Sequence, residues 1–379
     1  MEAAKNVVVL GCGRVGKAVA LDLSPRCQVK AVDTDPGAMR QLQGNGVQVV
    51  SEDATDCDVL PGLISEADLV INALPGHIGF DVLRKVIQCG KSVVDISFSP
   101  QDPFELDELA RSKGVVALVD CGVAPGLSNM VLGSLYRRMQ VSRFACYVGG
   151  LPAVRTWPYQ YKAPFSPSDV IEEYTRPARL VENGEMVVKP ALSDLEYLHF
   201  DEIGTLEAFN TDGLRTLLKT VNIPNMKEKT LRYPGHSEYI RVLRETGFFS
   251  SEPLDVKGQR VAPLDMTARL LFPHWQLAEG EEEYTLMKIV IEGCEAGEAV
   301  RYNCHLLDRF DRLTGLSSMA RTTGFTCAAV ATLVLEGRIS EVGIVPPEVI
   351  GMDRSRFDYV IDYLNGRNIR VERSRETPH

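Results

Sequence analysis

The chain has 379 residues, of which 45% are hydrophobic and 24% charged, and it contains no uninterrupted apolar run of membrane-spanning length. Its formal net charge of −10 argues against nucleic acid or an anionic membrane as the main partner, because both surfaces are negatively charged. This length favours two domains, and because no secretory leader is visible we expect a cytoplasmic protein.

The first predicted element is an apolar strand, residues 7–10, that leads directly into Gly11-Cys12-Gly13-Arg14-Val15-Gly16. This pattern is a dinucleotide-binding fingerprint. Gly11 allows a tight turn, Gly13 lets the backbone approach a pyrophosphate, and Gly16 permits close packing of the helix that follows. The pyrophosphate is expected on the helix N-terminus, beside Arg14 and Val15, where unpaired N–H groups and the helix dipole favour negative charge.

The second predicted strand, residues 29–32, ends on Asp33, at a distance from the glycines where a carboxylate reaches the adenosine ribose hydroxyls. Thr34 and Asp35 follow, rather than an arginine, so a 2′-phosphate would be repelled. The sequence therefore predicts NAD in preference to NADP. A lone glycine motif could be an ordinary turn before a helix, but here strand, glycines, helix and acidic residue all agree.

Strand-like and helix-compatible runs continue to alternate, with further strands predicted at residues 47–50, 69–73, 92–96 and 115–119. Six strands in a βαβ pattern predict an α/β fold, a doubly wound parallel Rossmann sheet that binds its ligand at the carboxyl ends of the strands. The cofactor contacts predicted from this position are Asp53, Ala54, Asn72, Ala73, Leu74, Pro75, Ile96 and Ser97.

From residue 127 the pattern changes to that of a second, α+β domain. It begins with a helix at 127–139, a strand at 143–148 and a sharp loop at 149–152. The aperiodic, aromatic segment 153–167 is typical of a functional loop. The later predictions are strands at 180–181, 186–188, 230–233, 284–292 and 299–306, helices at 211–219 and 237–246, a buried helix at 319–335, and a flexible tail beyond 371. The nine scattered cysteines indicate neither a disulfide framework nor a metal site.

Several motifs give the chain a resemblance to a known family. Besides the fingerprint they are V-D-C-G-V-A-P-G-L-S-N at 119–129, G-G-L-P at 149–152, F-S-P at 165–167, F-N-T-D-G-L at 209–214 and T-L-R-Y-P-G-H at 230–236. On these motifs the chain resembles the saccharopine dehydrogenase superfamily, and within it the lysine 6-dehydrogenases.

The resemblance implies a homodimer whose second domain is inserted into the dinucleotide fold. The dinucleotide-binding domain would comprise residues 1–126 and about 315–379, and the substrate-binding and dimerisation domain residues 127–314. The resemblance also implies a dehydrogenase that acts on CH–NH2 or CH–NH groups. Its reaction would be the NAD-linked oxidative deamination of the ε-amino group of L-lysine to allysine, which cyclises to piperideine-6-carboxylate.

Such a reaction needs a positioned proton acceptor, because the amine must lose its charge before hydride transfer and water must then attack the iminium. Asp120, after the sixth strand, is the first candidate, with a turn-forming role as the alternative. His236 and His77 are further acid–base candidates, although such histidines are more often packed or solvated.

Arg232 is the candidate for binding the substrate carboxylate through two parallel hydrogen bonds, with a surface salt bridge as the alternative. Tyr159, Tyr161 and Lys162 could close over the substrate. Thr211 and Asp212 are interpreted first as a helix N-cap and second as substrate contacts. Gly150, in the G-G-L-P element, completes the predicted substrate contacts.

Two alternatives remain. The same motifs would suit a saccharopine or a carboxynorspermidine dehydrogenase, whose substrates carry a secondary amine. The form G-x-G-R-V-G also resembles the NAD-sensing regulatory domains of potassium transport systems, but those modules resemble only the first third of the chain.

Overall fold

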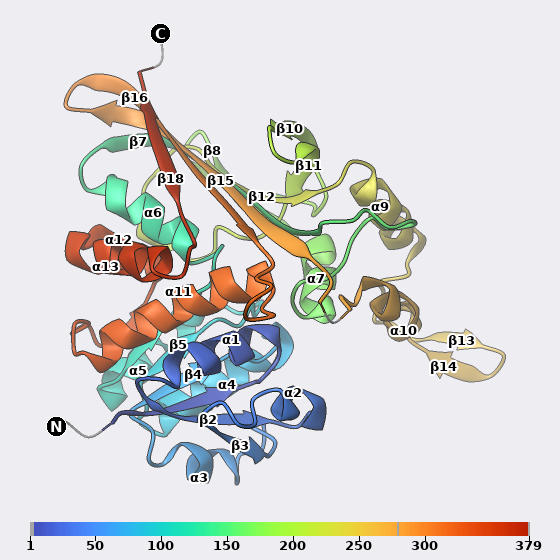
Figure 1. The fold of residues 1–379 in the computed structure, drawn as a ribbon. Coiled ribbons are helices and arrows are strands. Elements are labelled where there is room, and N and C mark those ends of the chain that lie inside the picture. The colour runs from blue at the N-terminus through green and yellow to red at the C-terminus, as the bar shows by residue number, and fades with distance from the viewer. Residues whose placement is uncertain (1–3, 279, 378–379) are drawn as a thin grey trace. The chain divides into compact units, whose positions relative to one another are not determined.

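The structure is a computed structural model that describes residues 4–278 and 280–377. The chain divides into two compact units (Figure 1). Unit 1 comprises the chain through Met139 together with Met319–Arg370, and unit 2 comprises Gln140–Ser318 and the chain from Val371. The predicted fold class, an α/β unit with a doubly wound parallel sheet and a second α+β unit, is confirmed.

Unit 1 contains a seven-stranded parallel sheet in the order β17-β6-β5-β4-β1-β2-β3. Its strands are β1 (Asn6–Leu10), β2 (Gln28–Asp33), β3 (Val47–Ser51), β4 (Leu69–Asn72), β5 (Val93–Asp95), β6 (Val116–Leu118) and β17 (Gly343–Val345). All six predicted strands are present, and the unpredicted β17 comes from the C-terminal segment. The strand order reverses between β1 and β4, so their carboxyl ends form the crevice in which open α/β sheets bind ligands.

The helices of unit 1 are α1 (Arg14–Leu23), α2 (Pro36–Arg40), α3 (Leu60–Ile64), α4 (Gly76–Gln88), α5 (Asp107–Lys113), α6 (Leu127–Tyr136), α12 (Pro347–Met352) and α13 (Arg354–Asn365), with the 3-10 helix η1 at Pro103–Leu106. Helix α11 (Ser318–Leu335) also belongs here apart from its first residue, and Gly324 lets it pack closely on α1. Within the described ranges, α11 is the one helix apolar and long enough to cross a membrane, but it is mostly buried, as a core helix would be.

Helix α6 lies in unit 1, whereas the sequence placed the domain boundary before it, at residue 127. The physical reason is close packing between α6 and α12 through two glycines. A Cβ atom on Gly133 would lie 2.2 Å from the Glu348 carbonyl oxygen, and one on Gly351 would lie 2.1 Å from that of Met130. The backbones therefore touch directly, which a sequence pattern does not reveal.

Unit 2 contains a mixed sheet whose main path is β10-β11-β12-β7-β15-β16-β18, with β8 pairing to β12 and β9 to β8. Its strands are β7 (Gln140–Pro152), β8 (Ala178–Glu182), β9 (Glu185–Lys189), β10 (Glu196–Phe200), β11 (Gly204–Asn210), β12 (Met226–Arg232), β15 (Glu283–Glu295), β16 (Glu298–Arg309) and β18 (Glu372–Glu376). A separate hairpin, β13 (Leu254–Val256) and β14 (Gln259–Val261), and helices α7 (Pro167–Thr175), α8 (Leu217–Thr220), α9 (His236–Thr246) and α10 (Pro263–Trp275) complete the unit.

Three predictions for unit 2 were wrong. The G-G-L-P segment is the end of β7 and pairs with β15; a Cβ atom on Gly149 would lie 2.5 Å from the Leu231 carbonyl oxygen, so glycine serves close strand packing here. In place of the helix expected at 211–219, the structure has the short helix α8. The tail expected to be flexible beyond 371 forms β18, which gains backbone hydrogen bonds from β16.

Candidate functional site

The turn between β1 and α1 has the geometry of a phosphate cradle. Gly11 has φ +91°, and a Cβ atom there would lie 2.7 Å from the Ala73 carbonyl oxygen. A Cβ atom on Gly16 would lie 1.9 Å from the Gly11 carbonyl oxygen. Gly13, the N-cap of α1, is different, because a Cβ atom there would meet no protein atom within 4 Å. The helix N-terminus therefore offers open space to an anion, as the dinucleotide prediction requires.

Asp33 lies beside this turn. Its Oδ2 atom accepts a hydrogen bond from the Cys12 backbone N–H at 2.5 Å, and Oδ1 accepts one from that of Asp35 at 2.8 Å. The Asp35 side chain caps α2 by accepting from Gly37 and Ala38. The sequence carries no cationic residue from Asp33 to Met39, although Lys17 Nζ lies 2.7 Å from Gln41 Oε1 just beyond α2. The Asp33 carboxylate fits the ribose of a dinucleotide.

The other predicted cofactor residues follow the carboxyl ends of β3, β4 and β5. Asp53 lies in an exposed turn, where hydrogen bonds from the Thr55 side chain and backbone lower its pKa, and the neighbouring Ala54 is buried. The residues after β4 continue into α4, whose N-cap is Pro75. Ala73 donates its backbone N–H to the Leu10 carbonyl, which ties the end of β4 to that of β1.

Asp95, the last residue of β5, is a buried site residue that the sequence analysis missed. It accepts hydrogen bonds from the Asn72 Nδ2 atom at 2.5 Å and from the Ser97 hydroxyl at 2.9 Å. Its position at the end of an apolar strand is the same signal that identified Asp33. That signal could have identified Asp95 as well.

Asp120 follows β6 and is buried, with φ +54°, a left-handed conformation that supports the turn-forming alternative. The next residue, Cys121, donates its backbone N–H to the Asp95 carbonyl at 3.1 Å. Asp120 is therefore held at the same sheet edge as Asn72 and Ser97, which also suits the proton-acceptor role. His77 lies on the exposed side of the first turn of α4.

Arg232, at the end of β12, is the centre of a buried network in unit 2. Its Nη2 atom donates to Glu173 Oε2 at 2.6 Å and to the Tyr161 hydroxyl at 3.3 Å, while Nε donates to the Tyr174 hydroxyl at 3.1 Å. The guanidinium carbon lies 4.3 Å from the centre of the Tyr161 ring. The surface salt bridge considered for Arg232 is thus a buried one. Glu173 accepts from Nη2 alone, while Nε donates to Tyr174 and Nη1 to the Leu231 carbonyl, so binding of a substrate carboxylate through two hydrogen bonds would require displacing some of these partners.

His236 extends this network. Its Nδ1–H donates to the Tyr159 carbonyl at 2.8 Å, so Nε2 accepts from the Tyr174 hydroxyl at 2.9 Å. Burial, followed by the charge of Arg232, lowers the pKa of His236 to about 3. A ring with this pKa is neutral near pH 7, so the geometry supports a positioning role for His236 and not the expected acid–base role.

The remaining predicted substrate residues have other partners. Gly150 is inside β7, and Lys162 donates to the Gln276 carbonyl at 3.1 Å. Thr211 is not an N-cap, because no helix starts there; its hydroxyl donates to Glu228 Oε2 at 2.6 Å. Asp212 forms an ion pair of 2.7 Å with Arg179.

Glu228 gives a testable pH dependence. Burial raises its pKa to about 8, against the opposing hydrogen bond from Thr211, so the folded protein keeps a proton that the unfolded chain releases near pH 4.5. Stability should therefore fall as the pH rises from 4.5 to 8, by at most about 1.4 kcal/mol per pH unit. Glu228→Gln should remove this slope, as measured by the melting temperatures of both proteins from pH 5 to 9. Parallel profiles would contradict the assignment.

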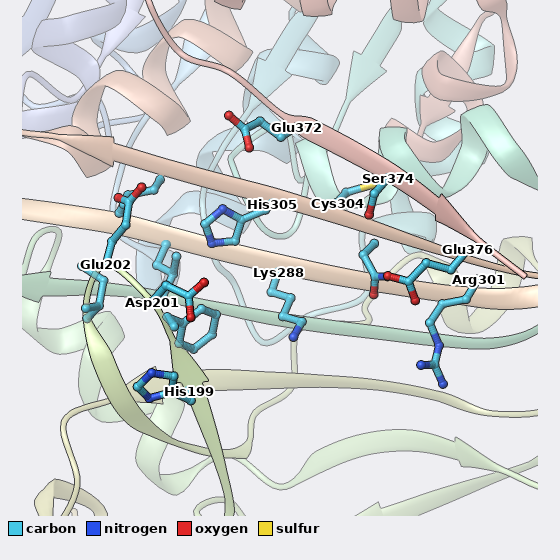
Figure 2. Close-up of a pocket in the computed structure, with 15 residues that line it drawn as sticks. His199, Asp201, Glu202, Lys288, Arg301, Cys304, His305, Glu372, Ser374 and Glu376 are labelled. Atoms are coloured by element: carbon cyan, nitrogen blue, oxygen red, sulfur yellow. The ribbon is translucent and has the colours of Figure 1, made fainter. Parts of the chain in front are cut away.

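Unit 2 also has a surface pocket of about 580 Å³ over β15, β16 and β18 (Figure 2). Lys288 and His305 are register partners on β15 and β16 and line it together. Glu202, Glu372 and Arg301 add charges of both signs. None of the predicted substrate residues lines this pocket.

Comparison with known proteins identifies two family models that match this chain. Residues 7–118 match the family model "Saccharopine dehydrogenase NADP binding domain", and residues 122–369 match "Saccharopine dehydrogenase C-terminal domain". The chain is 23% identical to a saccharopine dehydrogenase [NADP(+), L-glutamate-forming] of Schizosaccharomyces pombe, over 86% of this chain and 89% of the relative. It is also 23% identical to a carboxyaminopropylagmatine dehydrogenase of Synechocystis, over 76% of each.

Among solved structures, the apo saccharopine dehydrogenase (L-Glu forming) of Saccharomyces cerevisiae is similar, with a TM-score of 0.79 and 20% identity. The match covers 99% of this chain and 100% of that chain. At this identity the likeness shows a shared fold.

Proposed function

The chain belongs to the saccharopine dehydrogenase family, and from this premise we propose that it catalyses the NAD-dependent oxidative deamination of the ε-amino group of L-lysine. The product would be allysine, which cyclises to piperideine-6-carboxylate. The relatives are dehydrogenases that act on amine groups. The observation that carries the cofactor part of the proposal is the glycine turn, which leaves open space at Gly13 beside the carboxylate of Asp33, while the choice of lysine rests on the resemblance of the motifs.

In this proposal, different residues of unit 1 bind the cofactor and accept the proton of the substrate. The N-terminus of α1 binds the pyrophosphate, and Asp33 binds the adenosine ribose. When bound, the nicotinamide supplies the hydride acceptor. Asp120, buried at the same sheet edge, holds the substrate ammonium and accepts its proton.

The choice of NAD rests on charge. The family model over residues 7–118 and the Schizosaccharomyces pombe relative both name NADP, but in this chain Asp33 ends β2, Asp35 follows it, and no cationic residue lies between Asp33 and Met39. A dianionic phosphate beside two carboxylates is repelled. The sequence signal and the geometry of Asp33 therefore both support NAD.

Replacement of Asp33 tests this choice. We expect Asp33→Ala to weaken NADH binding about tenfold, through loss of charge-assisted hydrogen bonds to the ribose. Asp33→Arg should shift the preference toward NADPH. Fluorescence titration of both variants with both cofactors measures the effect. Unchanged NADH affinity in both variants would remove Asp33 from the cofactor site.

An absorbance assay for NADH formation tests the reaction itself. We expect turnover with L-lysine and NAD, and none or much less with saccharopine, carboxynorspermidine or carboxyaminopropylagmatine. Turnover with one of the secondary amines would assign the chain to that alternative. Cofactor binding without turnover on any amine would favour the NAD-sensing alternative.

Two further features remain predictions, the homodimer and the cytoplasmic location. Sedimentation velocity of the purified chain would measure the first. Fractionation of the source cells would measure the second.

A further inference from the structure

We propose that Asp95 is a positioning residue that fixes the Asn72 side-chain amide, so that Asn72 Oδ1 accepts a hydrogen bond from the nicotinamide half of the bound dinucleotide. The inference rests on the proposed function only in assuming that a nicotinamide dinucleotide binds at this sheet edge.

The orientation of the Asn72 amide is determined by its two partners. Nδ2 lies 2.9 Å from the Gly79 carbonyl oxygen and 2.5 Å from Asp95 Oδ1. Both partners are acceptors, so the group that faces them must be the NH2 group. The opposite orientation would bring Asn72 Oδ1 against two acceptors, and it is therefore excluded by repulsion.

This orientation leaves a buried acceptor for a ligand. Asn72 is fully buried, and its Oδ1 atom has no hydrogen-bond partner among the residues that the structure describes. A buried polar atom without a partner costs free energy, which a ligand donor would recover. In the proposal that donor is a hydroxyl or amide of the dinucleotide, and because Oδ1 has almost no accessible surface, the side chains around it must shift when the dinucleotide binds.

The position of Asn72 indicates which half of the dinucleotide supplies that donor. A doubly wound sheet consists of two mononucleotide-binding halves that meet where the strand order reverses. The glycine turn and Asp33 belong to the half built from β1, β2 and β3. Asn72 ends β4, the first strand of the other half, so the proposal assigns it to the nicotinamide nucleotide and not to the adenosine.

Asp95 is itself held in place. The Ser97 hydroxyl lies 2.9 Å from both of its carboxylate oxygens. Gly79 is required for this arrangement, because a Cβ atom there would lie 2.3 Å from Ser97 Cβ. The absence of that atom lets α4 approach β5 and brings the Gly79 carbonyl to the Asn72 amide.

The test compares binding of the whole dinucleotide with binding of its adenosine half. Asn72→Ala removes the acceptor, and Asp95→Ala removes the carboxylate that holds the Asn72 NH2 group. We expect each variant to bind NADH about tenfold more weakly than wild type, while binding of ADP, which lacks the nicotinamide nucleotide, is unchanged. The double variant should bind NADH no more weakly than either single variant, since Asp95 acts through Asn72.

The control is Asp22→Ala, the same chemical change at the far end of α1, where Asp22 accepts from Arg367 Nε at 2.6 Å. It should leave the affinity for NADH and ADP unchanged, whatever its effect on melting temperature. Equal losses of NADH and ADP affinity in Asp95→Ala, additive losses in the double variant, or wild-type NADH affinity in Asn72→Ala would each overturn the proposal. The last outcome applies even if Asp95→Ala does not fold.

The same titrations are run with NADPH and 2′,5′-ADP. If the wild type bound NADPH and 2′,5′-ADP more tightly than NADH and ADP, the proposed preference for NAD would be refuted. The comparison of the Asn72 and Asp95 variants would still be valid. The two proposals can therefore fail separately.

Discussion

Gly13→Ala should weaken NADH binding roughly 100-fold and leave unit 1 folded. The added methyl group meets no protein atom within 4 Å, and the φ of Gly13, −58°, suits any L-residue. The loss of a glycine N-cap costs at most about 1 kcal/mol. The methyl group would instead occupy the space of the pyrophosphate, whose displacement breaks hydrogen bonds to charged oxygens worth about 1.5–3 kcal/mol each. NADH fluorescence titration and calorimetric melting measure the two effects.

Gly16→Ala is the matched comparison three residues along the same turn. Its methyl group would lie 1.9 Å from the Gly11 carbonyl oxygen, so the turn itself must shift. We expect this variant to lose NADH affinity and also to melt at a lower temperature. If Gly13→Ala bound NADH as wild type does, no pyrophosphate would lie at this turn.

Arg232→Met should destabilise unit 2 by about 3–5 kcal/mol, because it leaves the carboxylate of Glu173 buried without its partner. The guanidinium is almost fully buried, and Glu173 already has a pKa raised by burial, against the lowering effect of Arg232. Urea denaturation monitored by tryptophan fluorescence suits this measurement, because Trp275 packs against Tyr161 and Tyr174.

The double variant Arg232→Met with Glu173→Gln separates charge from packing. It removes the uncompensated carboxylate, so it should recover much of the lost stability. An equal loss in the single and double variants would mean that Arg232 stabilises the unit by packing alone. If Arg232 also binds substrate, Arg232→Lys should raise the Michaelis constant for lysine without changing NADH affinity.

The cofactor site was predictable because its signals are local in the sequence. The glycines, the strand before them and Asp33 lie within 27 residues, and hydrophobic periodicity identified six of the seven strands of the parallel sheet. The partners in unit 2 were not predictable in this way. Glu173 meets Arg232 across 59 residues, and Thr211 meets Glu228 because β11 and β12 pair.

The amino-acid sequence by itself determined the alternation of strands and helices, the glycine turn and the acidic corner at Asp33, since each depends on the conformational and charge preferences of neighbouring residues. Only the tertiary structure decided which polar groups are buried together. It pairs Asn72 with Asp95, surrounds the guanidinium of Arg232 with Glu173 and two tyrosines, and lowers the pKa of His236. The reason is that desolvation and hydrogen-bond partnership arise from contacts between distant segments, and these contacts decide which side chains can still bind a ligand.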